Sequence, residues 1–215
     1  MTNQNTNRYE PSIERRLDDI VSFTAVIEKF MDVKRATMRH GRPETDGEHT
    51  LRLQFIAVAY AARYHSELDI GKVSQYALVH DLVEVYAGDV NSLTASPEEI
   101  SVKALTERAA LDRLVEELGE SWPYLINVLV EYEELADAEA RFVKCFDKCD
   151  PSLSHCADGG EALLKMGVVT NEQFFAMHER SRARLAEFED EFPDVLEIRE
   201  KLVARVADTT FPVVY

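Results

Sequence analysis

The chain has 215 residues, of which 46% are hydrophobic and 30% charged, and its formal net charge at pH 7 is −16. This length and composition predict one globular domain with a sizeable core. The 24 basic residues form no long run. The charge therefore excludes the basic surface typical of proteins that bind DNA or RNA, and we expect no nucleic-acid polymer as a partner.

The cysteines and the N-terminal sequence favour a cytoplasmic protein. The cysteines, Cys145, Cys149 and Cys156, are an odd number in one short stretch, and the first residues lack the basic and apolar pattern of a secretory signal peptide. The longest apolar run, Phe55 to Ala62, is far shorter than the ~20 residues that a membrane-spanning helix needs. We expect a cytoplasmic location and no membrane segment.

Apolar residues recur with helical spacing along most of the chain. Residues 1–11 are polar and are expected to form a flexible N-terminus, followed by one domain over residues 12–210. The predicted helices cover residues 12–33, 48–64, 77–88, 97–118, 121–135, 138–157, 171–188 and 193–207. Pro151 is expected to kink or break the sixth of them.

Residues 34–47 separate the first two predicted helices and show no periodicity. This segment is rich in turn formers and basic residues, and positive charge is unusual in so acidic a chain. We expect an ordered loop beside a functional site. Because no stretch alternates polar and apolar residues for long enough to predict a strand, the predicted fold class is an all-α, single-domain helical bundle.

The helix predicted over residues 77–88 carries charged residues on a mostly apolar background. His80, Asp81 and Glu84 are spaced so that one helical face presents an imidazole and two carboxylates to a common point. Buried ionisable groups are costly unless something pairs with them, and a bound cation can pair with all three. A solvent-facing His-Asp pair would look the same in sequence.

Two residues from other helices strengthen the prediction of a metal site. His49 lies in the first turn of the second predicted helix, and Asp147 lies in the sixth. Together with His80 and Asp81, they supply enough ligands to hold one divalent cation and to leave positions open for water. A set of nitrogen and oxygen ligands suits Mn²⁺, Co²⁺, Fe²⁺ or Zn²⁺, and the sequence does not rank these metals.

Three blocks of this sequence resemble the HD-domain metal-dependent phosphohydrolases, and most closely their 5′-deoxynucleotidase branch. The blocks are Glu48-His49, the run from His80-Asp81 through Glu84 to Gly88-Asp89, and the run Glu-Ala-Arg-Phe-Val-Lys-Cys-Phe-Asp that ends at Asp147. The resemblance covers about residues 30–155 and implies the all-α HD-domain fold. It also implies a homodimer.

The resemblance implies roles for individual residues. The implied metal ligands are His49, His80, Asp81 and Asp147. Glu84 matches a catalytic carboxylate that transfers a proton or orients the attacking water, and Asp89 matches a carboxylate near the nucleotide sugar. Arg35 is the best match for the arginine that holds the substrate phosphate, and Lys34 is the alternative for that role.

One departure from the family pattern concerns substrate choice. The family often has a tryptophan next to or just after the phosphate-binding arginine, where it helps to exclude a ribose 2′-hydroxyl. This chain has Ala36 and Thr37 there, and its one tryptophan, Trp122, lies elsewhere. The expected preference for deoxynucleotides, and the identity of the base, therefore stay open.

These residues predict a metal-dependent phosphohydrolase that removes phosphate from small-molecule nucleoside 5′-monophosphates, deoxynucleotides in particular. The alternatives are an HD hydrolase of another phosphoester or pyrophosphate, and a protein that binds metal or nucleotide without hydrolysis. Glu84 favours the enzyme, because a purely structural cation needs neither a non-ligating carboxylate nor a cationic loop beside an open coordination position.

Other residues have simpler interpretations. Cys145 and Cys149 are four positions apart, a spacing that a second zinc site would allow, but buried helical cysteines more often act as small hydrophobic residues. The run Asp158-Gly159-Gly160 is expected to be a flexible connection. His65 and His178 are expected at surface positions of helices.

Overall fold

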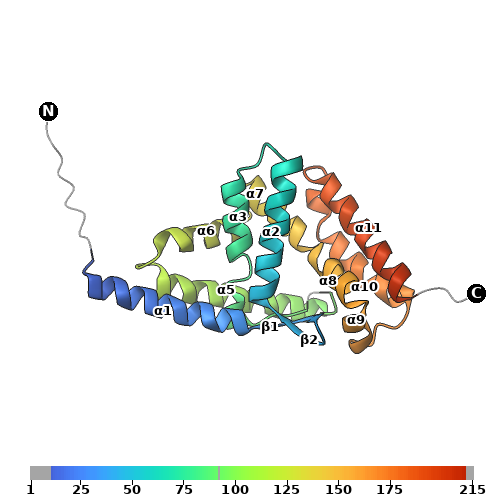
Figure 1. Cartoon of the computed structure of the whole chain (residues 1–215), viewed down its shortest axis with the longest axis horizontal. Helices are drawn as coiled ribbons and strands as arrows, with labels where there is room; N and C mark the ends of the chain where they lie inside the picture. Colours follow the sequence, from blue (N-terminus) through green and yellow to red (C-terminus); the bar gives the residue numbers. More distant parts are fainter. Residues whose placement is uncertain (1–10, 92, 212–215) are drawn as a thin grey trace, which may run out of the picture.

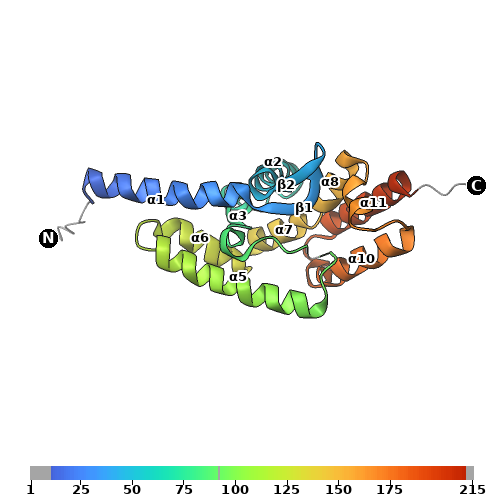
Figure 2. The same cartoon turned by 90° about the horizontal axis from the view of Figure 1, so that it is seen from below.

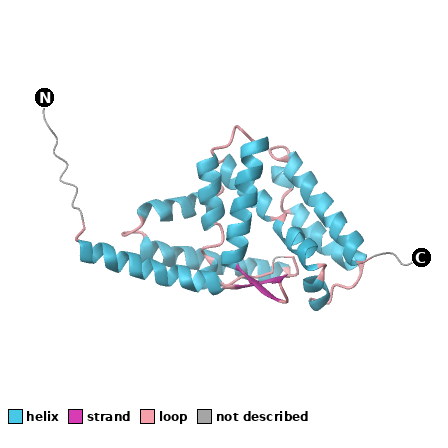
Figure 3. Ribbon diagram, in the orientation of Figure 1, coloured by secondary structure: helices cyan, strands magenta, loops and turns pink. Residues whose placement is uncertain are grey.

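The computed structural model describes residues 11–91 and 93–211, and these are mostly helical (Figures 1 and 3). The helices are α1 (Ile13–Asp32), α2 (Asp46–Tyr64), α3 (Ile70–Val79), α4 (Glu84–Ala87), α5 (Pro97–Leu118), α6 (Pro123–Glu133), α7 (Ala138–Asp147), α8 (Asp150–Asp158), α9 (Glu161–Lys165), α10 (Asn171–Ala183) and α11 (Pro193–Thr210). A two-stranded sheet pairs β1 (Lys34–Arg39) with β2 (Arg42–Thr45), and η1 (Ala186–Phe188) is a short 3₁₀ helix. The predominantly helical class is confirmed. The predicted flexible segment 1–11 lies outside the described residues except for Pro11.

Local sequence signals explain where the long helices begin. Thr45 and Ser96 each accept a hydrogen bond from the backbone N–H three residues later, and in each case the glutamate at that position bonds back to the cap. These capping boxes satisfy backbone donors that would otherwise lack partners at the starts of α2 and α5. Pro123 and Pro193 occupy the first turns of α6 and α11, where a missing N–H costs little.

The predicted loop over residues 34–47 is instead largely a β-hairpin, the magenta element in Figure 3. His40 and Gly41 form its turn with φ values of 51° and 79°, and two consecutive left-handed residues are typical of tight hairpin turns. The inward side chains are polar, since Thr37 donates a hydrogen bond to Glu44 at 2.9 Å. An alternating apolar pattern therefore never develops, and the sequence pattern misses the strands.

The prediction of one continuous helix over residues 77–88 is wrong, because the helix is interrupted in its middle. Helix α3 ends at Val79, and residues 80–83 form turns before the single turn of α4. Backbone hydrogen bonds here join residues three apart, as in Leu82 to Val79 and Glu84 to Asp81. This tighter winding breaks the α-helix at the His-Asp pair.

A second break separates α7 from α8 at Lys148 and Cys149, as expected near Pro151. Pro151 lies in the first turn of α8. This break lets Asp147 and Asp150 project from different helices. The predicted connection at Asp158 to Gly160 is followed by α9, a short helix that the sequence analysis missed.

Helices α2 and α3 pack side by side at the centre, and α3 also packs against α6 and α7 (Figure 1). Seen from below, α1 runs along the upper edge of the molecule, at about the level of α2, and α5 runs along the lower edge (Figure 2). The largest group of buried apolar residues joins these helices, and a smaller group links α9, α10 and α11. Most apolar residues of the last two helices therefore pack within the chain, although Phe175 of α10 is exposed. Among the described residues, no helix is both long and apolar enough to cross a membrane.

Candidate active site

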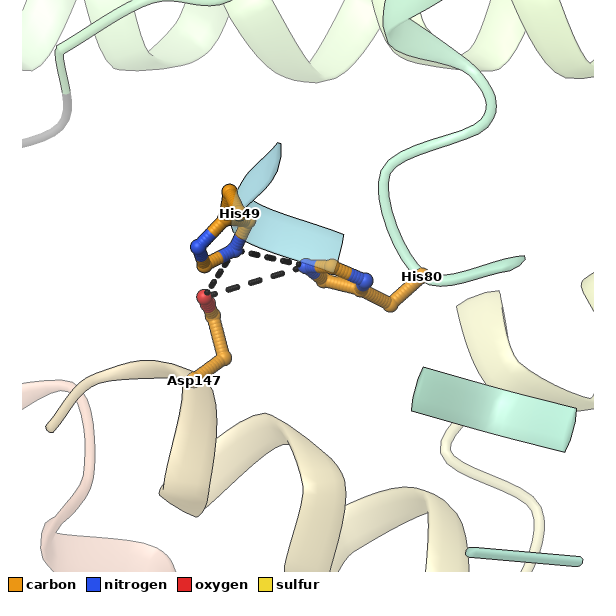
Figure 4. Close-up of side chains that lie close together, drawn as sticks. All are labelled: His49, His80 and Asp147. Atoms are coloured by element: carbon orange, nitrogen blue, oxygen red, sulfur yellow. Dashed lines mark hydrogen bonds and ion pairs between the residues drawn. The ribbon is translucent and has the colours of Figure 1, made fainter. Parts of the chain in front are cut away.

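The predicted metal ligands from α2, the turn after α3, and α7 meet at one point. Figure 4 shows His49, His80 and Asp147 directed toward one another. The Nε2 atoms of His49 and His80 lie 3.0 Å apart, and Asp147 Oδ1 lies 3.1 Å from His49 Nε2. Asp81 Oδ2 completes the group at 2.9 Å from His80 Nε2 and 3.4 Å from His49 Nε2.

The second nitrogen of each imidazole fixes which atom faces this point. His49 Nδ1 lies 2.8 Å from Asp150 Oδ2, and His80 Nδ1 lies 3.0 Å from the carbonyl oxygen of Ala77. An ionised carboxylate and a carbonyl only accept, so both Nδ1 atoms donate. In the neutral rings, two Nε2 lone pairs therefore face each other, which is unfavourable unless a cation or a proton lies between them.

The charges around the histidines favour a cation at this point. Burial lowers the pKa of His49, but the charge of Asp150 and hydrogen bonds from its ring to Asp147 and Asp150 outweigh burial and raise the pKa to about 10. A positive charge is thus favoured here even when it is only a proton. Burial raises the pKa of Asp147, yet Lys148 and His49 hold it well below the usual range, so this carboxylate is ionised. Neutral imidazoles with ionised carboxylates are the donor set that a divalent cation requires.

A buried network behind His49 supports its orientation. Arg52 Nε donates to Asp150 Oδ1 at 2.9 Å, and Arg52 Nη2 donates to Glu44 Oε2 at 3.0 Å. Asp150 and Glu44 are 1% and 0% exposed. Asp150 was not predicted from the sequence, although its position one turn after Asp147 was the available signal. Its partners His49 and Arg52 both lie on α2, far earlier in the chain, and show no spacing pattern with it.

A cavity of about 290 Å³ opens beside the four ligand residues. Arg35, Glu84 and Asp89 line it, whereas Lys34 is exposed and does not. Arg35 Nη1 donates to Asp81 Oδ2 at 2.8 Å and to Asp46 Oδ1 at 3.1 Å. Its Nε is buried and has no acceptor among the described residues, so one donor of the guanidinium is left unpaired.

Glu84 lines the cavity, and its two carboxyl oxygens differ in their hydrogen bonding. Its Oε1 accepts a hydrogen bond from Lys103 Nζ at 3.1 Å, and Lys103 also pairs with Glu107 at 3.0 Å. Its Oε2 is buried and has no partner in the part of the chain that the structure describes. Burial and the charge of Asp81 raise the pKa of Glu84 to about 10, so this carboxyl holds a proton at neutral pH. Lys103 carried no signal in the sequence, because α5 reaches the site only through tertiary packing.

Asp89 accepts a hydrogen bond from the backbone of β1, the strand that carries Arg35. Burial raises the pKa of Asp89, while the charge of Arg35 and a hydrogen bond from the Ala36 backbone N–H lower it, and the net shift is upward. Ala36 and Thr37 line the same cavity. Trp122 does not line it, and its ring instead contacts Phe23 at 5.4 Å between centroids.

The cysteines take no part in this site. Cys145 and Cys149 are buried, Cys156 is exposed, and all three are free thiols. Burial raises the pKa of Cys149 to about 12, which keeps the thiol protonated. No group of three potential metal ligands within residues 11–91 and 93–211 includes a cysteine.

Comparison with known proteins identifies the family of the chain. The family model described as HD domain matches residues 27–190. The human 5′-deoxynucleotidase HDDC2 is 32% identical over 116 residues, which are 51% of this chain and 52% of that protein. The 5′-deoxynucleotidase ECA3034 of Pectobacterium atrosepticum is 25% identical over 127 residues, 52% of this chain and 64% of that protein. The match to the human relative thus spans about half of its length.

Solved structures share the fold over most of the chain. A crystal structure of a predicted metal-dependent phosphohydrolase from Magnetospirillum magnetotacticum is 27% identical, has a TM-score of 0.69, and is matched over 91% of this chain and 95% of that one. The PH0347 protein of Pyrococcus horikoshii, at 21% identity and a TM-score of 0.54 over 86% of this chain and 99% of that one, shows the shared fold alone. The chain belongs to the HD-domain superfamily of metal-dependent phosphohydrolases.

Proposed function

We propose that this HD-domain protein hydrolyses nucleoside 5′-monophosphates to nucleosides and phosphate. One observation carries the proposal: two imidazole Nε2 atoms face each other at 3.0 Å beside two aspartates, next to a cavity that is lined by an arginine and a buried glutamate. The resemblance to 5′-deoxynucleotidases narrows the substrate from phosphoesters in general to nucleotides.

We assign one divalent cation to His49, His80, Asp81 and Asp147. A cation held there supplies Lewis-acid stabilisation of the charge that develops on a phosphoryl group during hydrolysis. Arg35 contributes a second positive charge beside Asp81, and as a residue that lines the cavity it can donate to a phosphate oxygen. The guanidinium thereby orients the phosphate toward the ligand residues.

Glu84 is assigned the proton chemistry. Its buried Oε2 has no partner among the described residues, and the raised pKa keeps a proton available at neutral pH. That proton neutralises the alkoxide that leaves when water forms a new bond to phosphorus and the phosphoester bond breaks, and the proton released by the water restores the carboxyl group. Lys103 holds Oε1 and so fixes the rotamer of the carboxyl group.

The sugar is assigned to the region of Asp89, Ala36 and Thr37. The carboxyl group of Asp89 can accept a hydrogen bond from a sugar hydroxyl. Ala36 has a small side chain, and the hydroxyl of Thr37 donates a hydrogen bond to Glu44. Neither residue therefore fills the space beside Asp89 as a tryptophan would. We therefore propose that deoxyribonucleotides and ribonucleotides are both substrates.

The experiment is phosphate release from a panel of ribo- and deoxyribonucleoside 5′-monophosphates. Metal-stripped protein is assayed alone and with Mn²⁺, Co²⁺, Fe²⁺ or Zn²⁺ added back singly. Release that requires metal supports the proposal, and the ratio of deoxy to ribo rates measures the sugar selection. Release only from pyrophosphates or from other phosphoesters would show that the proposed substrate class is wrong. No release despite bound metal would indicate that the protein binds its ligand without hydrolysis.

We also propose a homodimer, as the resemblance implies. Among the described residues, helix α1 carries a run of exposed apolar side chains, namely Ile13, Leu17, Ile20 and Val21. Such a surface is more often an interface than open surface. Sedimentation velocity of the wild type and of Leu17→Glu tests this, and two equally monomeric samples would refute the dimer.

A further inference from the structure

The cavity beside the ligand residues is lined by several cations, and their partners differ. Arg35 donates to Asp81 and Asp46, Lys103 pairs with Glu84 and Glu107, and Lys148 Nζ lies 2.5 Å from Asp147 Oδ2. Lys144 also lines the cavity but has no hydrogen bond or ion pair with any residue in 11–91 or 93–211. Within the described chain, Lys144 is a cavity lysine whose donors are not used.

Lys144 stands close to the ligand residues on the same helix. It lies three positions before Asp147 on α7, so both side chains project from one face. Its Nζ lies 6.0 Å from the centroid of the Tyr132 ring, and the His80 ring meets Tyr132 edge-on at 6.1 Å between centroids. Lys144 and His80 therefore approach the same aromatic ring.

The surroundings of Lys144 do not supply the missing acceptor. Glu133 lines the same cavity, but no ion pair joins it to Lys144 in the described chain. Burial and the charge of Lys148 lower the pKa of Lys144 by more than the charges of Asp147, Glu133 and Asp81 raise it. An ammonium has three donors and no acceptor, and leaving them unpaired in a half-buried place is costly.

We propose that Lys144 is a substrate-binding residue that donates to a non-bridging oxygen of the phosphate held beside Asp147. This inference rests on the proposed function, because it takes a phosphate monoester as the ligand of the cavity. Arg35 and Lys144 come from β1 and α7, so they would contact the phosphate dianion from two different elements. Orthophosphate, the product, has the same oxygens and binds the same donors.

The test measures orthophosphate binding by titration calorimetry to protein loaded with Mn²⁺, so no turnover is needed. Lys144→Met and Lys144→Gln remove the charge, and Lys144→Arg keeps it. The matched control is Lys201→Met, which removes an exposed lysine that pairs with Glu197 on α11. We expect the Kd for orthophosphate to rise about 10-fold to 100-fold in the two neutral variants, and to stay within a few-fold of wild type in Lys144→Arg and in the control.

Bound Mn²⁺ is measured in each sample, and all variants should retain it because Lys144 forms no hydrogen bond or ion pair with the four ligand residues. Neutral variants that bind orthophosphate as tightly as the wild type would overturn the inference. Equal losses in Lys144→Arg and Lys144→Met would also overturn it, because the charge would then not matter. If no nucleotide is hydrolysed while orthophosphate binding still depends on Lys144, the proposed substrate fails and the phosphate site stands.

Discussion

Asp150 Oδ2 lies 2.8 Å from His49 Nδ1, and this contact decides which nitrogen of His49 faces the other ligand residues. Replacing Asp150 with asparagine removes the negative charge behind the ring, and we expect the affinity for Mn²⁺ to fall about 10-fold to 100-fold. Glu44→Gln is the matched control, because Glu44 also binds Arg52 but forms no hydrogen bond or ion pair with His49. Metal titration of both variants is the measurement, and equal affinities in the two would contradict the role of Asp150.

Glu84 and Glu107 share one lysine, which makes them a second matched pair. Lys103 Nζ lies 3.1 Å from Glu84 Oε1 and 3.0 Å from Glu107 Oε1. Glu84→Gln should keep the metal and lower kcat about 100-fold to 10,000-fold, because a proton donor is lost. Glu107→Gln should leave kcat within a few-fold of the wild type. A fully active Glu84→Gln enzyme would show that its assigned role is wrong.

Ala36 offers a direct change to sugar selection. In Ala36→Trp, a large ring would enter the cavity beside Asp89, where the ribose 2′-hydroxyl is proposed to lie. We expect the ratio of kcat/KM for dAMP over AMP to rise about 10-fold or more, since the ring excludes the extra hydroxyl. An unchanged ratio, with activity retained, would mean that the sugar lies elsewhere in the cavity.

His178 makes the folded state sensitive to acid. Burial, and next the charge of Arg199, lower the pKa of His178 from 6.5 to about 3. Between these two values the unfolded chain binds the proton and the folded chain does not, so stability falls as the pH drops. The titration of His178 alone should lower the free energy of unfolding by about 2 kcal/mol between pH 7 and pH 5.

The measurement for His178 is urea unfolding at pH 7 and pH 5. His178→Phe keeps a ring against Phe174, whose centroid lies 4.4 Å from that of His178, and removes the titrating group. Between pH 7 and pH 5, the free energy of unfolding should fall by about 2 kcal/mol less in the variant than in the wild type. Identical losses would assign the acid sensitivity to other groups.

Signals that lie within one segment were predictable from the sequence. The capping box at Ser96, the proline at the start of α11 and the break near Pro151 are each encoded by a few consecutive residues. The cluster of His49, His80, Asp81 and Asp147 was also predicted, because those residues stand in recognisable blocks. The expected roles of Glu84, Asp89 and Arg35 stay predictions.

Features that depend on tertiary packing were not predictable. Asp150 and Lys103 meet their partners only after helices distant in the sequence have packed together. His65 and His178 were expected on the surface but are 8% and 3% exposed, since the helix period alone does not reveal a second packing surface. Conversely, Ile13 and Leu17 follow the helical apolar pattern but are exposed in α1, since the pattern does not show how far along a helix its neighbours extend.

The central claim is that one cation at His49, His80, Asp81 and Asp147 is required for phosphate release from a nucleotide. The most direct measurement is the rate of phosphate release from dAMP as stripped protein is titrated with Mn²⁺, for the wild type and for Asp81→Asn. We predict no release without metal, a plateau near one equivalent for the wild type, and no release from the variant at the same metal concentrations. Release by the stripped wild type, or equal release by Asp81→Asn, would contradict the claim.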